Sequence, residues 1–101
     1  MSIPIDDGED WILRLYVAGQ TARSLRAVAN MRKICTDQID DRYRLEVIDL
    51  YQQPELAQGE QIVALPALIK RLPEPLRMII GDLSDTEHVV AGLDLLRRQG
   101  Q

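Results

Sequence analysis

The chain has 101 residues, 46% of them hydrophobic, and its 12 basic and 16 acidic residues leave a formal net charge of −4. This length predicts one domain with a modest core, and the acidic balance argues against a nucleic-acid groove. Residues 1–10 lack the basic and apolar regions of a signal peptide, and no apolar run approaches the ~20 residues of a membrane span. We therefore expect no nucleic-acid partner and no membrane partner. Because the chain also has a single cysteine, we expect a cytoplasmic protein.

Residues 1–10 contain the acidic run Asp6 to Asp10, interrupted by Gly8, and predict a flexible N-terminal extension. We expect a single domain over residues 11–98 and a short tail over residues 99–101. The domain opens with a predicted strand over Trp11–Val17, whose apolar residues are nearly continuous and are broken only by Arg14. That pattern is typical of a central strand covered on both faces.

An amphipathic helix is expected next, over Ala22–Thr36, with Thr21 as its N-cap. Its predicted buried stripe comprises Leu25, Val28, Met31, Ile34 and Cys35. Its outer face carries the cations Arg23, Arg26, Arg32 and Lys33. Two interpretations of these cations stay open, namely a docking surface for an acidic partner and a merely solvated face.

The junction between this strand and this helix reads Ala18-Gly19-Gln20-Thr21-Ala22 and contains no thiol. Thioredoxin-like redox enzymes place a Cys-x-x-Cys motif at this junction, where the thiol pKa is lowered. The one cysteine, Cys35, is predicted to be a small buried apolar residue of the helix. We therefore expect no disulfide chemistry.

A second strand is predicted from Tyr43 to Leu50, where Tyr43, Leu45 and Val47 alternate with Arg44 and Glu46. A strand, a helix and a strand in this order favour a right-handed, parallel unit. Proline is well placed at the first position of a helix, so a short helix is expected from Pro54 to about Gln61, weakened by Gly59.

The segment between Leu65 and Ile80 fits two structures. Its apolar residues recur at helical spacing, yet Pro66, Pro73 and Pro75 would interrupt a helix. The alternative is a hairpin of two strands, Ala67–Leu72 and Leu76–Ile80, joined across Pro73-Glu74-Pro75. Both interpretations stay open at this point.

The last segment is ambiguous in the same way. Ser84 and Glu87 have the spacing of a capping box, so a helix is predicted from Asp85 to Arg98, with Ser84 as its N-cap. The run Val89–Leu96 is also apolar enough for a buried strand, and Gly92 costs a helix interior ~1 kcal/mol relative to Ala. The local sequence is compatible with either element.

The chain offers no set of residues for catalysis. His88 is the only histidine, is expected on an exposed helical turn, and lacks a second His or a Cys to complete a metal site. Asp82, Ser84 and Asp85 could be imagined as a serine–carboxylate site, but the capping of a helix explains all three. We predict no catalytic residue, no metal and no cofactor.

Several runs of residues, taken in order and spacing, resemble those of KaiB, the small circadian clock protein of cyanobacteria with relatives in other bacteria. They are Leu15-Tyr16-Val17-Ala18-Gly19, Glu46-Val47-Ile48-Asp49-Leu50, Gln53-Pro54-Glu55-Leu56-Ala57, Leu65-Pro66-Ala67-Leu68 and Ile79-Ile80-Gly81-Asp82-Leu83-Ser84-Asp85. The resemblance covers roughly Trp11 to Arg97. The first run alone also looks like the thioredoxin-like sensor domain of a clock histidine kinase.

The resemblance implies a non-enzymatic regulator that binds the ring of KaiC, a P-loop ATPase that phosphorylates itself, and promotes its dephosphorylation phase. It implies an α/β, thioredoxin-like fold, βαβαββα, that exchanges with a resting fold, βαββααβ, in which the chain self-associates as a dimer or tetramer. The fold switch would gate binding, and a clock histidine kinase would compete for the same site on KaiC. The competing hypothesis is a thioredoxin-like interaction adaptor in stress or signalling, without an oscillator.

The residues expected to contact the partner lie on the first helix and on the segment after the second strand: Arg23, Arg26, Tyr51, Gln52, Pro54, Leu56 and Gln61. The residues expected to take part in the fold switch are Pro66, Pro73, Pro75, Gly81, Asp82 and Ser84. By similarity to thioredoxin-like folds, Pro66 is expected to follow a cis peptide bond. Replacing Gly81 with Ala is expected to favour the thioredoxin-like form, since glycine at such a junction adopts a positive φ in one fold only.

Overall fold

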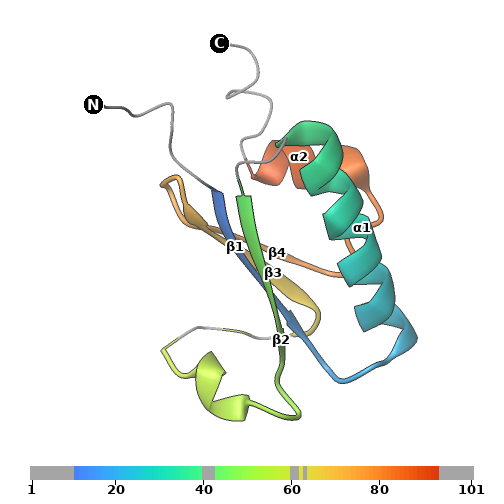
Figure 1. The fold of residues 1–101 in the computed structure, drawn as a ribbon, viewed down its shortest axis with the longest axis vertical. Helices are drawn as coiled ribbons and strands as arrows, with labels where there is room; N and C mark the ends of the chain where they lie inside the picture. Colours follow the sequence, from blue (N-terminus) through green and yellow to red (C-terminus); the bar gives the residue numbers. More distant parts are fainter. Residues whose placement is uncertain (1–10, 40–42, 60–61, 63, 94–101) are drawn as a thin grey trace.

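The computed structural model describes residues 11–39, 43–59, 62 and 64–93. In chain order its elements are β1 (Trp11–Val17), α1 (Ala22–Gln38), β2 (Tyr43–Asp49), the 3-10 helix η2 (Pro54–Ala57), β3 (Ala67–Leu72), β4 (Arg77–Ile80) and α2 (Thr86–Gly92) (Figure 1). The predicted N-terminal extension, the end of the last predicted helix, the predicted tail and Gln61 lie outside the described residues.

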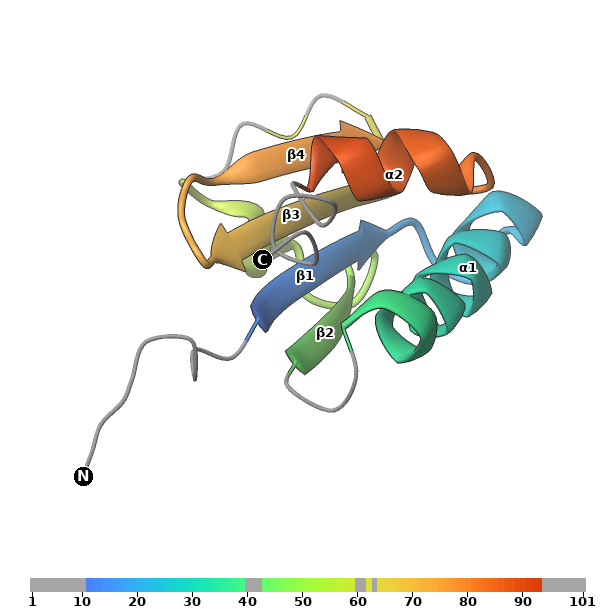
Figure 2. The same ribbon diagram turned by 90° about the horizontal axis from the view of Figure 1, so that it is seen from above.

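The strands form one four-stranded sheet in the order β2-β1-β3-β4, which Figure 2 shows as a fan. β1 runs parallel to β2 and antiparallel to β3, and β4 returns antiparallel to β3. The predicted parallel unit of strand, helix and strand is therefore confirmed. The order of elements is that of the predicted fold, with η2 in place of its second helix.

β1 is a central strand covered on both faces, as predicted. On one side, its alternate residues Trp11, Leu13, Leu15 and Val17 belong to the larger core, with α1 and α2 above them. On the other side, Tyr16 joins Ile48 and Ile69 in a smaller core, against which Leu56 of η2 packs. Figure 1 shows α1 and α2 to one side of the sheet and η2 away from them, at the other.

Helix α1 begins where it was predicted, but its buried stripe is rotated. The Thr21 side chain accepts a hydrogen bond from the Ser24 N–H, which confirms the N-cap. Leu25, predicted to be buried, is 55% exposed, whereas Ser24 is buried. Ser24 tolerates burial because its Oγ accepts hydrogen bonds from the Ala18 N–H at 3.1 Å and from Thr21 Oγ1 at 3.0 Å. Of the other predicted stripe residues, Met31, Ile34 and Cys35 are buried.

The helix that follows β2 is shorter than predicted. The 3-10 helix η2 begins at Pro54 but ends at Ala57, because the chain becomes extended at Gln58, with ψ of 136°. Gly59 then takes a φ of +84°, which ends the helical turn. β2 itself is an edge strand, so Val47 is 38% exposed despite the alternating pattern.

Residues 67–80 form the hairpin of β3 and β4, so the helical interpretation of this segment is wrong for this structure. Ala67 pairs with Ile80 and Lys70 with Arg77, which leaves the prolines outside the paired positions. β4 begins at Arg77, one residue later than predicted. The peptide bond before Pro66 is cis, as expected, and so are those before Pro73 and Pro75.

Helix α2 confirms the helical interpretation of the last segment as far as the described residues extend, and Val89 and Val90 are buried within it. The predicted capping box is wrong, because the N-cap is Asp85, whose Oδ1 accepts a hydrogen bond from the His88 N–H at 3.2 Å. Ser84 is one residue too early. Its own N–H is held by Asp82 Oδ1 at 3.1 Å, and the preceding residue has a φ of +64°.

Candidate functional site

Two loops meet at the end of the sheet where β1 and β2 both finish. We refer to residues 18–21 and 49–53 together as the corner surface. Asp49 Oδ1 accepts hydrogen bonds from the backbone N–H of Gly19 at 3.0 Å and of Tyr51 at 2.9 Å. The Asp49 carbonyl accepts two more, from Gln52 at 3.0 Å and Gln53 at 2.9 Å. One residue therefore joins the loop before α1 to the loop before η2.

Most of the predicted contact residues after β2 are exposed at this corner or beside it. Tyr51 is 72% exposed, and Gln52 and Pro54 are exposed as well. Leu56 is different, because it is half-buried and packs against the smaller core. Its carbonyl also accepts a hydrogen bond from the Tyr16 hydroxyl at 3.4 Å. Leu56 thus packs against the smaller core, unlike its exposed neighbours.

The predicted basic residues of α1 do not form one uniform face. Arg23 is exposed and lies four residues along the chain from Gly19 of the corner surface. Arg26 is exposed too, but its Nε lies 3.2 Å from Asp82 Oδ2, across the β4–α2 loop. Lys33 pairs with Asp37 within the helix at 2.9 Å. Only Arg23 therefore adjoins the corner surface through the chain, while Arg26 belongs to another cluster.

That second cluster surrounds Asp82 and contains four of the predicted switch residues: Pro66, Gly81, Asp82 and Ser84. Besides its contacts with Arg26 and Ser84, Asp82 offers its carbonyl to Asn30 Nδ2 at 2.8 Å. The hydrogen bonds from Ser84, followed by the one from Arg26, lower the pKa of the Asp82 carboxyl. The Gly81 N–H donates to the Pro66 carbonyl at 2.9 Å. Pro73 and Pro75 lie in the turn of the hairpin and do not join this cluster.

The backbone of this cluster takes conformations that side chains disfavour. Gly81 has a φ of +125° and Leu83, a buried leucine, has a φ of +64°. Alanine at position 81 would be strained here even though no atom obstructs its Cβ. The strain in this form opposes the expected direction of Gly81→Ala, which stays a prediction because it depends on the backbone at position 81 in both folds.

Lys70 is a structural residue that the sequence analysis missed. It lies on the helix-covered face of β3, 1% exposed. Its Nζ donates to the Leu93 carbonyl at the end of α2 at 3.2 Å and lies 5.3 Å from the centre of the Trp11 ring. The sequence did contain a signal for this burial. Lys70 follows the apolar Leu68 by two residues, and residues two apart on a strand lie on the same face of the sheet.

Cys35 lies in the larger core, where burial raises the pKa of its thiol to about 12. The thiolate needed for disulfide chemistry is therefore not populated near neutral pH. Among the described residues, no group of three or more His, Cys, Asp or Glu side chains is arranged to hold a metal ion. Within the same residues, we find no helix with the length and apolar character of a membrane span.

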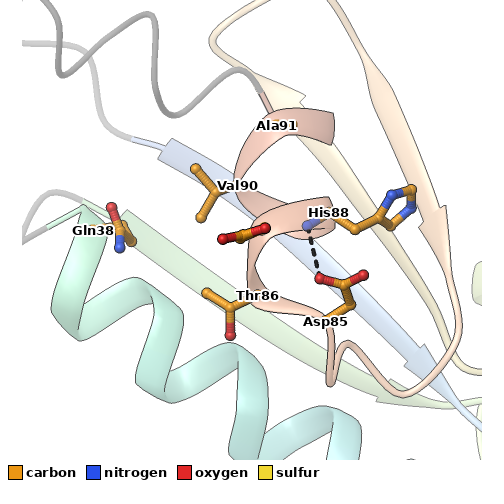
Figure 3. A pocket seen from close by; sticks show the side chains of 7 residues that line it. Gln38, Asp85, Thr86, His88, Val90 and Ala91 are labelled. Carbon is orange, nitrogen blue, oxygen red and sulfur yellow. Dashed lines mark hydrogen bonds between the residues drawn. The ribbon is translucent and has the colours of Figure 1, made fainter.

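His88 lines an open hollow of about 650 Å³ between the end of α1 and the outer side of α2. Gln38, Asp85, Glu87 and Val90 contribute to its wall. Figure 3 shows the His88 ring and the Gln38 amide at opposite sides of this hollow. The contact of Asp85 with the His88 backbone is the α2 cap already described. The hollow brings together none of the predicted contact residues.

The KaiB domain family matches residues 14–95 of this sequence. The chain belongs to the KaiB family. It is 48% identical over 85 residues to "Circadian clock protein KaiB3" of Synechocystis sp., with 84% of this chain and 83% of the relative covered. It is 52% identical over 86 residues to "Circadian clock oscillator protein KaiB" of Prochlorococcus marinus strain MIT 9312, with coverages of 85% and 82%.

Solved structures confirm the predicted thioredoxin-like fold. The N-terminal domain of Synechococcus elongatus SasA superposes with a TM-score of 0.70 at 24% identity, with 92% of this KaiB-family chain and 88% of that chain covered. Chloroplastic thioredoxin z superposes with a TM-score of 0.69 at 15% identity, with coverages of 88% and 80%. At these identities the likeness shows the fold alone.

Proposed function

We propose that this protein is a KaiB-type circadian clock regulator that binds the ring of a KaiC-like P-loop ATPase and promotes its dephosphorylation phase. The observation that carries the proposal is family membership over nearly the whole chain, with about half of the residues identical to curated clock proteins. The corner surface supports it, because an exposed Tyr with an amide and a cation nearby suits protein recognition. The fold shared with the SasA domain supports competition for one site on the ring.

We further propose that a fold switch gates this binding. The support comes from the Asp82 cluster, where Gly81 and Leu83 hold positive φ values, and from the two structures that residues 65–96 fit on sequence alone. Two arrangements within a few kcal/mol need a local sequence that tolerates both. The second arrangement is the resting βαββααβ form, in which we expect a dimer or tetramer. The binding-competent arrangement is the one described above.

The proposed role is non-enzymatic and cytoplasmic. Cys35 supports the first part, since its thiol is buried and the strand–helix junction carries none. We expect Cys35→Ser to leave partner binding within a few-fold and to leave disulfide reduction at the level of the uncatalysed reaction. Turnover of a disulfide substrate that this substitution abolishes would contradict a non-enzymatic role.

The direct test mixes the purified protein with the KaiC-like ATPase of the same organism and resolves the mixture by size exclusion. We expect co-elution in a ring-sized complex and faster loss of phosphate from the ATPase. Tyr51→Ala should weaken the complex, whereas Leu76→Ala is a matched control, because Leu76 is 53% exposed at the distant turn of the hairpin. A protein that leaves the ring untouched, yet captures another signalling protein, would favour the adaptor hypothesis.

A further inference from the structure

Tyr51 has the largest exposed fraction, 72%, among the large hydrophobic side chains of the described residues that face solvent. It lies in a loop, two residues after the end of β2. An exposed aromatic side chain in a loop normally occupies several rotamers, and a partner that immobilises it must offset the lost conformational entropy. A fixed orientation before binding would remove part of that cost.

The Tyr51 ring is in contact with the backbone of the other loop. A Cβ built on Gly19 would lie 2.8 Å from Tyr51 Cδ2 and 3.1 Å from Cε2, so the ring occupies the space that a side chain at position 19 would need. Gly19 also has a φ of +63°, which favours glycine independently. One side of the ring therefore rests on Gly19 while most of its surface remains exposed.

Asp49 holds both partners of this contact in place. Its carboxylate accepts the N–H of Gly19 at 3.0 Å and of Tyr51 at 2.9 Å, so a single oxygen sets the distance between the two backbones. Its carbonyl accepts hydrogen bonds from the N–H groups of Gln52 and Gln53, and these bonds close the turn that carries Tyr51. The strand anchors this arrangement, since Leu50 donates to the Val17 carbonyl at 3.0 Å.

We propose that Asp49 is the positioning residue of the partner-binding surface, and that it acts by holding the Tyr51 ring on Gly19 in the orientation that the partner recognises. This inference rests on the proposed function for the identity of the partner. Gln52, the next residue along the chain, is also exposed, and so is Arg23 on the first turn of α1. The matching surface on the partner is an apolar pocket with an acidic rim.

The first experiment measures the affinity of variants for the KaiC-like ATPase ring by biolayer interferometry. Asp49→Ala should weaken binding about tenfold, because the ring loses its fixed orientation. Asp49→Asn keeps an acceptor oxygen and should stay within about twofold of wild type. Glu46→Ala is the matched control, since Glu46 lies on the same strand and loses a hydrogen bond, to Arg14 at 2.8 Å, away from Tyr51.

A double-mutant cycle separates positioning from a general structural role. If Asp49 acts through Tyr51, Asp49→Ala should cost no further affinity in a Tyr51→Ala background, so the double variant binds like Tyr51→Ala. Equal losses in both backgrounds would overturn the proposal. So would an unchanged affinity of Asp49→Ala in the wild-type background.

A measurement without the partner tests the geometry itself. The Tyr51 ring should displace the NMR shifts of the Gly19 amide and α protons, and Tyr51→Ala should return them to ordinary values. Asp49→Ala should reduce the displacement, whereas Asp49→Asn should retain it. If wild type fails to bind the ATPase but these shifts behave as expected, the proposed function fails and the positioning remains. Shifts insensitive to Asp49→Ala would refute the positioning even where binding is strong.

Discussion

The two halves of this chain differ in how firmly their local sequence specifies structure. In the first half, β1, α1 and β2 form where one pattern predicts them, and Thr21 caps α1 as expected. In the second half, β4 has four residues and α2 seven, and the loop between them holds two residues with positive φ. Agreement between local and global preferences is what gives a chain one stable structure. The first half thus forms a scaffold on which the second half is held chiefly by tertiary contacts.

The largest effect on the free energy of unfolding should come from truncating a fully buried leucine, and it should differ between the two halves. Leu15 of β1 and Leu93 at the end of α2 are both 0% exposed. We expect Leu15→Ala to lower the free energy of unfolding by about 3–4 kcal/mol. Leu93→Ala should lower it by about 1–2 kcal/mol, because α2, as described, has only seven residues and can shift to fill the space. Urea unfolding followed by circular dichroism measures both. Equal losses would show that the two halves are equally well specified.

Lys70 connects the halves, and its removal should have the next largest effect. Lys70→Ala loses the buried side-chain stem and the hydrogen bond to Leu93, so we expect the free energy of unfolding to fall by about 2–3 kcal/mol. Lys70→Met keeps the apolar volume and should cost less than about 1.5 kcal/mol. Urea unfolding compares them, with the exposed Lys33→Ala as control. Equal losses in the two variants would mean that the charge and its hydrogen bond, which both variants remove, matter more than the packing of the stem.

Gly81→Ala should destabilise the described form by about 1–2 kcal/mol, because its φ of +125° suits glycine. Gly59→Ala is the matched control, since Gly59 also has a positive φ and no atom within 4 Å of its Cβ position. Two-dimensional NMR should show a second set of signals growing in Gly81→Ala and not in Gly59→Ala. A second set of NMR signals in both variants, or in neither, would show that Gly81 has no particular role in the fold switch.

The smallest effect concerns the exposed pair of Arg26 and Asp82. Because the pKa of Asp82 is lowered in the folded protein, its ionised form adds stability that is present above about pH 4 and is lost as pH falls through the lowered pKa. Asp82→Asn should flatten this part of the profile of melting temperature between pH 6 and pH 3. Arg26→Glu should lower the melting temperature slightly, and by less than Asp82→Asn does near pH 7, because Asp82→Asn also weakens the acceptor of the Ser84 N–H. A profile unchanged by Asp82→Asn would place the acid sensitivity elsewhere.

The sequence predicted the fold well where a pattern depends on local spacing. The central position of β1 follows from its continuous apolar run. The cis bond before Pro66 had a different basis, since it was expected from similarity to thioredoxin-like folds. It failed where a residue's role depends on distant partners. Leu25 resembles a core residue by spacing, yet the oxygens and N–H groups around Ser24 decide the phase of α1.

The same limit applies to the candidate sites. The capping box at Ser84 matches a local rule, but Asp82 engages the Ser84 N–H and moves the helix start to Asp85. The grouping of Arg26 with the predicted switch residue Asp82 joins positions 56 residues apart. No pattern within one helix or one loop contains that contact. Lys70 shows the converse, since a buried cation contradicts the usual preference of lysine for solvent.

The contact of Lys70 with Trp11 provides a spectroscopic reporter. Trp11 is the one tryptophan in the chain, is buried, and has the Lys70 ammonium 5.3 Å from its ring centre. That ammonium is in turn bound to the last turn of α2. The emission of an indole depends on nearby charge and on water, both of which would change if the end of α2 left the sheet. Intrinsic fluorescence can therefore follow the docking of α2 in the unlabelled protein, in real time and in the presence of a partner.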